Sequence, residues 1–117
     1  MTNTHFTEHP PVPQVLQEAL KDYPELIAQL QDAIADLGIR PGMSREQRTD
    51  QFEMAIGSLE GGLNHFVGLA AAEVRAAEAT GDAALIAKAR GKEMLMSDCR
   101  HDIGVDELMA FFRWGQD

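Results

Sequence analysis

The sequence has 117 residues, 44% of them apolar, and these values are typical of a single globular domain and not of a disordered chain. It carries one cysteine, a net charge of −9 and no stretch of about 20 apolar residues that could span a membrane. An internal disulfide is therefore excluded, direct binding to nucleic acid is disfavoured, and we expect a cytoplasmic protein without membrane contact.

The first 13 residues are expected to form a flexible N-terminal arm. Proline fixes one backbone dihedral and disfavours helix in the residue before it, and the arm contains Pro10, Pro11 and Pro13. The following residues are rich in alanine and leucine, which favour helices. We therefore predict one all-helical domain over residues 14–117, preceded by the arm at 1–13.

Two short helices are expected at the start of this domain. The first runs from Gln14 to about Lys21. The second is expected to have Asp22 as its N-cap, because Glu25 follows at the spacing of a capping box. One apolar stripe with helical spacing follows, formed by Leu26, Ile27, Leu30, Ile34 and Leu37. Gly38 is the expected end of this second helix.

The strongest pattern in the sequence is a long helical seam. Ser44 and Gln47 have the spacing of a capping box, and the helix that they begin is expected to reach about Thr80. Apolar residues then recur at steps of three or four: Phe52, Ile56, Leu59, Leu63, Phe66, Ala70, Val74 and Ala77. A seam of this length predicts a helix that packs along another helix.

Four glycines lie within this segment, and in a helix interior each lowers the stability of the helix by roughly 1 kcal/mol relative to alanine. They are Gly57, Gly61, Gly62 and Gly68. Either the helix is continuous, with Gly57 and Gly61 allowing another backbone to approach closely, or it breaks near Gly61 and Gly62. The unbroken seam favours the continuous helix.

A tight connection is expected after this helix. Gly81 can adopt the left-handed conformation that ends a helix, and Asp82 can cap the next one. The next helix is expected over about 83–96. Short connections join antiparallel neighbours, so we expect the two helices to form a long antiparallel hairpin over about 44–97.

After a bend at 99–104, a last short helix is expected over about 105–113. The fold class is thus all-α, a small helical bundle built on the long hairpin with short N- and C-terminal helices. The C-terminal cluster of Phe111, Phe112 and Trp114 either docks within the chain or contributes to a homodimer.

Few residues have the pattern of a chemical site. Cys99, His101 and Asp102 are close in sequence, but no second Cys/His cluster completes a metal site, so a polar bend with a partly buried thiol is the favoured interpretation. His65 has no acidic partner at helical spacing for general acid–base catalysis. We expect no catalytic residue, metal site or cofactor. A metal-dependent enzyme that uses Cys99, His101 and His65 is kept as an alternative.

The leading functional hypothesis is therefore a non-catalytic intracellular protein-interaction module, such as a small adaptor, regulator or inhibitor, which binds a protein partner, itself as a homodimer, or both. Large aromatic side chains often dominate interface energetics, so Phe111, Phe112 and Trp114 are the expected anchors. Gly57 and Gly61 are the expected points of close contact.

An alternative functional hypothesis is based on the acidic residues of the chain. The excess of acids over bases lies in residues 14–37 and in the C-terminal tail. Asp32 and Asp36, with the other acids of residues 14–37, could imitate the phosphates of a nucleic acid and occupy a basic site. The protein would then be a decoy of nucleic-acid-binding machinery, comparable in class to the anti-defence (anti-CRISPR-like) proteins of mobile elements.

Overall fold

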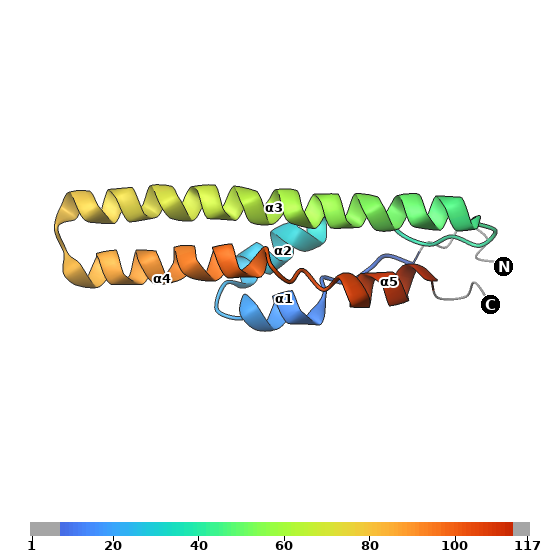
Figure 1. The fold of residues 1–117 in the computed structure, drawn as a ribbon, viewed down its shortest axis with the longest axis horizontal. Coiled ribbons are helices and arrows are strands. Elements are labelled where there is room, and N and C mark those ends of the chain that lie inside the picture. The colour runs from blue at the N-terminus through green and yellow to red at the C-terminus, as the bar shows by residue number, and fades with distance from the viewer. Residues whose placement is uncertain (1–7, 114–117) are drawn as a thin grey trace.

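The computed structural model describes residues 8–113, and over this range the chain forms five helices without a strand (Figure 1). In chain order they are α1 (Gln14–Ala19), α2 (Pro24–Ala33), α3 (Arg45–Thr80), α4 (Ala83–Cys99) and α5 (Val105–Arg113). The predicted all-helical class and the long hairpin are confirmed.

The hairpin of α3 and α4 is the axis of the molecule. A capping box of Ser44 and Gln47 begins α3, as predicted. Gly81 ends α3 with a left-handed φ of 70°, and the Asp82 carboxylate then accepts hydrogen bonds from the first backbone N–H groups of α4. These local signals reverse the chain within two residues, so α4 returns along α3 (Figure 1).

The continuous form of α3 is the one that the structure adopts, since its 36 residues are uninterrupted through all four glycines. Most of the predicted seam is buried, and Phe52 and Ile56 at its beginning are half-buried. At 1.5 Å per residue the helix is about 54 Å long, which explains the elongated shape of the molecule.

The helix α5 follows α4 after a bend and packs against the first part of α3 (Figure 1). Leu108 and Phe112 are its buried side chains, and the Phe112 ring meets Phe52 of α3. Of the two docking modes expected for the C-terminal aromatic cluster, Phe112 adopts the intramolecular one.

The helix α2 covers the middle of α3, where Leu30 lies against Gly62. Its N-cap is Tyr23 without a side-chain hydrogen bond, so the prediction of Asp22 was wrong. Pro24 occupies the first helical position and keeps Tyr23 out of the helical conformation, with φ −130° and ψ 64°, which places the helix start one residue later than the capping-box spacing indicated.

The end of α2 also differs from the prediction, because the helix stops at Ala33 and not near Gly38. The backbone N–H of Gly38 donates to Oε1 of Gln51 on α3, 2.9 Å away, and the ring Nδ1 of His9 donates to the Leu37 carbonyl. Ile34 and Leu37 remain in the core, but Ile34 lies in the turn after α2 and Leu37 in the irregular segment that follows this turn.

The part of the expected arm that the structure describes, residues 8–13, packs on the domain. Glu8 pairs with Ile39 in an isolated antiparallel bridge, and Pro10, Val12 and Pro13 are buried. The side chain of Gln31 on α2 holds this segment, since it accepts from the Val12 N–H and donates to the Pro10 carbonyl, both at 3.0 Å. The expectation of a flexible arm at residues 1–7 lies outside the described residues.

Candidate interaction surface

One side of α3 points away from every other helix, and α3 forms an uninterrupted edge of the molecule there (Figure 1). We call this side the outward face. All its members are exposed and recur at helical spacing: Asp50, Met54, Gly57, Gly61, His65, Gly68, Leu69, Ala72 and Arg75. The same steps of three and four that form the buried seam therefore occur a second time, on the opposite side of the helix.

The outward face has an apolar centre and charged ends. Of these members between Asp50 and Arg75 only His65 is ionisable, while the exposed carboxylates Glu53 and Glu60 lie one helical turn from Gly57 at its border. The two large apolar side chains on it, Met54 and Leu69, are 54% and 48% exposed. Another molecule could cover the glycines and the two apolar side chains of this strip while the carboxylates at its border remain in contact with solvent.

The glycines of α3 fall into two groups. A Cβ added at Gly62 would lie 2.8 Å from Cδ2 of Leu30 on α2, so a larger residue here would force this buried side chain to shift. A Cβ added at Gly57, Gly61 or Gly68 would meet nothing within 4 Å. The described part of the chain therefore gives no packing reason for these three glycines, although each weakens the helix by roughly 1 kcal/mol relative to alanine.

The predicted aromatic anchors occupy different environments. Phe112 is only 2% exposed, so it is a core side chain and not an accessible anchor. Phe111 is half-buried and packs edge to face on Phe112, with 4.9 Å between ring centroids. Trp114 lies outside the described residues. The C-terminal helix thus stabilises the domain, and Phe111 alone of the two described rings is partly available to a partner.

The predicted acidic residues are both accessible. Asp32 lies on α2 and Asp36 lies in the turn that follows it, and both side chains are exposed. Neither has an ion pair with another residue in the range 8–113. They could meet a basic partner, but nothing in their surroundings distinguishes them from ordinary solvated carboxylates.

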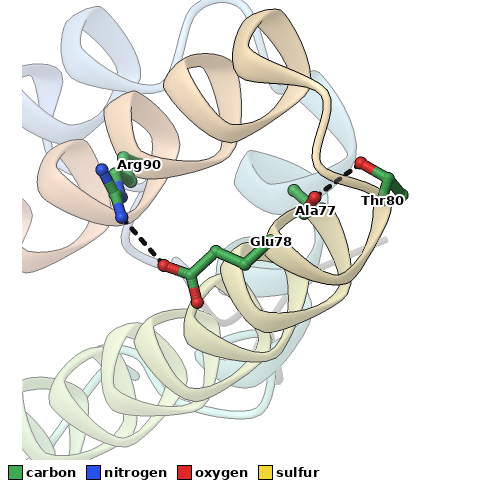
Figure 2. A network of polar contacts seen from close by, with 4 residues as sticks. All are labelled: Ala77, Glu78, Thr80 and Arg90. Atoms are coloured by element: carbon green, nitrogen blue, oxygen red, sulfur yellow. Dashed lines mark hydrogen bonds and ion pairs between the residues drawn. The ribbon is translucent and has the colours of Figure 1, made fainter.

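The outer end of the hairpin is joined by contacts between α3 and α4. Arg90 of α4 pairs with Glu78 of α3 at 2.8 Å, and within the last turn of α3 the Thr80 hydroxyl donates to the Ala77 carbonyl (Figure 2). Lys92 pairs with Glu73 at 3.2 Å and lies over the Tyr23 ring, 5.0 Å from its centroid. The Arg90–Glu78 pair is exposed and the Lys92–Glu73 pair has an exposed carboxylate, so each stabilises the hairpin by only about 0–1 kcal/mol.

A groove of about 650 Å³ lies beside these contacts, where α2 begins. Its walls combine small apolar side chains, including Ala76, Ala77 and Ala89, with Tyr23 and charges of both signs. This mixed lining does not select one class of ligand.

The residues with possible chemistry do not form a site. Cys99 ends α4 and is buried, whereas His101 and Asp102 are exposed in the bend that follows. Burial raises the pKa of the Cys99 thiol, and the nearby Asp98 carboxylate adds to this effect, so the thiol is held in its less reactive protonated form. Within residues 8–113 no three His, Cys, Asp or Glu side chains come together as metal ligands.

His65 is exposed on the outward face, with its ring 6.4 Å from that of Phe66 between centroids. It makes no hydrogen bond to another described side chain that would orient it for proton transfer. Its position instead makes it a polar member of a helix surface.

Sequence reasoning identified Gly57 and Gly61 but missed the other members of the outward face. The available signal was the second helical spacing, Met54, Gly57, Gly61, His65, Gly68 and Ala72, opposite the apolar seam. This spacing has low hydrophobicity because half of its members are glycines, so a search for apolar periodicity passes over it.

A scan against known protein families and searches of characterised proteins and solved structures find no match to this chain. Over residues 8–113, no helix combines the length and apolar character needed to cross a bilayer. Function must therefore be inferred from the surface itself.

Proposed function

We propose that this chain is a non-catalytic intracellular protein-interaction module whose contact surface is the outward face of α3. The observation that carries the proposal is the set of three exposed glycines, Gly57, Gly61 and Gly68, in the middle of a helix that would be more stable without them. Helix glycines allow a second backbone to approach closely, and such an approach would explain their presence.

Two further features support the proposal. Met54 and Leu69 provide large apolar side chains on the same face, so a partner would bury apolar area there as well as approach the glycines. The acidic side chains of α2 lie outside this face, which allows a partner to bind without meeting the main concentration of negative charge. The regular helix also presents these groups on a rigid element.

The test compares two glycines that differ only in location. Gly61 lies on the outward face and Gly91 lies on α4, and each is an exposed helix residue with nothing within 4 Å of an added Cβ. Leucine at either position should leave the fold intact. We expect Gly61→Leu to remove the proteins that the tagged chain captures from a lysate, as read by quantitative mass spectrometry, and Gly91→Leu to retain them.

Equal capture by both variants would contradict the proposal. The same experiment separates it from the acidic decoy. A captured partner that is released by salt, is lost in the Asp32→Asn/Asp36→Asn variant and persists with Gly61→Leu would indicate the decoy, because exposed charge contacts are screened by salt whereas apolar contacts are not.

A further inference from the structure

We infer that the partner of the outward face is a second copy of this chain, packed antiparallel on α3 about a two-fold axis at Gly61. This inference rests on the proposed function and names its partner. It follows from the order of large, small and charged residues along the face.

Two of the larger residues of the face, Met54 and His65, have a glycine at the equivalent position on the other side of Gly61. Met54 lies seven residues before it and Gly68 lies seven residues after it, while Gly57 and His65 lie four residues before and after. In an antiparallel pair centred on Gly61, Met54 of one copy therefore faces Gly68 of the second copy, and His65 faces Gly57. Met54 and His65 thus each meet a glycine, Leu69 lies opposite Glu53, and Gly61 meets itself where the two backbones are closest.

The charges at the ends of the face are complementary in the same arrangement. Arg75 lies fourteen residues after Gly61, whereas Glu46 and Asp50 lie fifteen and eleven residues before it. Arg75 of one copy is thus placed between Glu46 and Asp50 of the second copy, and the two-fold axis repeats this contact at the other end. All three side chains are exposed, and none has an ion pair with another residue between 8 and 113.

A parallel pair would lack both properties. Each residue of the face would then meet its own equivalent, so Met54 would oppose Met54 and Arg75 would oppose Arg75 of the second copy. Like charges and like sizes would coincide, which disfavours the parallel arrangement. A heterologous partner would not require the face to be symmetric about one of its own residues.

The first experiment measures the mass of the full chain by sedimentation equilibrium over a series of concentrations. We expect a dimer that dissociates on dilution. Gly61→Leu should abolish it because the new side chains collide at the axis, and the control Gly91→Leu should leave it unchanged. A chain that remains monomeric at the highest concentration, or a dimer that survives Gly61→Leu, would overturn the inference.

The second experiment tests the antiparallel register by charge reversal. The Arg75→Glu variant and the Glu46→Lys/Asp50→Lys variant each place like charges at both ends of their own dimer, so the Kd of each should rise roughly threefold or more at low ionic strength. An equimolar mixture of the two should recover dimerisation, because both ends of the mixed dimer are then complementary. A mixture that stays as weak as its components would rule out this register.

The results also distinguish this inference from the proposed function. If the chain is monomeric but Gly61→Leu still removes a captured heterologous protein, the surface is correct and its partner is not a second copy. If the chain is monomeric and Gly61→Leu removes nothing, both fail.

Discussion

The rings of Phe52 and Phe112 meet edge to face, with 6.3 Å between their centroids and 66° between their planes. This contact joins the beginning of α3 to the end of α5, which are separated by the whole length of the hairpin in sequence. Removing Phe112 should therefore detach the C-terminal helix. We expect Phe112→Ala to lower the free energy of unfolding by about 3–5 kcal/mol, as measured by urea denaturation.

Phe111→Ala is the matched control for this substitution. Phe111 is half-buried, so its loss should cost clearly less than that of Phe112. Equal effects of the two substitutions would contradict the assignment of Phe112 to the core. For the same reason a truncation after Asp106 cannot test partner binding, because it removes the buried Leu108 and Phe112 together with any exposed anchor.

The neighbouring glycines Gly61 and Gly62 should respond differently to alanine. Gly61→Ala should raise the free energy of unfolding of the monomer by up to about 1 kcal/mol, because it adds helix propensity without a contact. At Gly62 the added Cβ meets the buried Leu30, and the repacking should cancel this gain or reverse it. A double-mutant cycle with Leu30→Ala measures the coupling. Zero coupling between positions 30 and 62 would show that α2 does not pack there.

Two glycines with positive φ form a second matched pair. Gly42 has φ 81° and open space around an added Cβ, so Gly42→Ala should cost only the strain of the left-handed conformation, about 1–2 kcal/mol. Gly104 has φ 82°, and an added Cβ would also overlap Pro13. Gly104→Ala should therefore cost more than Gly42→Ala in thermal or urea unfolding. Equal costs would mean that the segment at Pro13 is not packed on the bend before α5.

Stability should fall in alkaline solution because of Cys99. Burial raises the pKa of its thiol above the ordinary value near 9.0, which we take for the unfolded chain. Below that value both states hold the proton and the thiol contributes no pH dependence. As the pH rises further, the unfolded chain releases the proton first, so the free energy of unfolding decreases until the folded thiol also ionises.

The measurement for Cys99 compares the wild-type chain with Cys99→Ala in urea at neutral pH and at a pH above that of the free thiol. The difference in stability between the two proteins should shrink at the higher pH. A difference that is the same at both pH values would show that the thiol is not desolvated in the folded state.

The parts of the fold that the sequence predicted are those specified by neighbouring residues. The apolar seam from Phe52 to Ala77 predicts α3, because its spacing is that of the helix itself. The capping box at Ser44 and the pair Gly81 and Asp82 similarly predict where the hairpin begins and turns. Helix ends held by distant groups were not predictable in this way, and α2 stops early where Gln51 and His9 bind the backbone after it.

The candidate surface was only partly predictable for a related reason. The spacing of Gly57 and Gly61 drew attention to α3, but the exposure of Met54 depends on which side of the helix α4 and α5 occupy. For Phe112 the sequence alone could not show whether the side chain is buried in its own chain or in a partner, because the hydrophobic C-terminal cluster is compatible with both. Its burial became evident only from its contact with Phe52.

The most direct test of the proposed contact surface is the variant that carries Gly57→Ala, Gly61→Ala and Gly68→Ala together. Its unfolding free energy, extrapolated to low protein concentration, and its association should be measured on the same preparation, with Gly91→Ala as the control. The proposal predicts that the triple variant has a higher free energy of unfolding as a monomer but no longer associates. The Gly91→Ala control should gain stability and associate normally. A triple variant that is more stable and associates as well as the wild-type chain would contradict it.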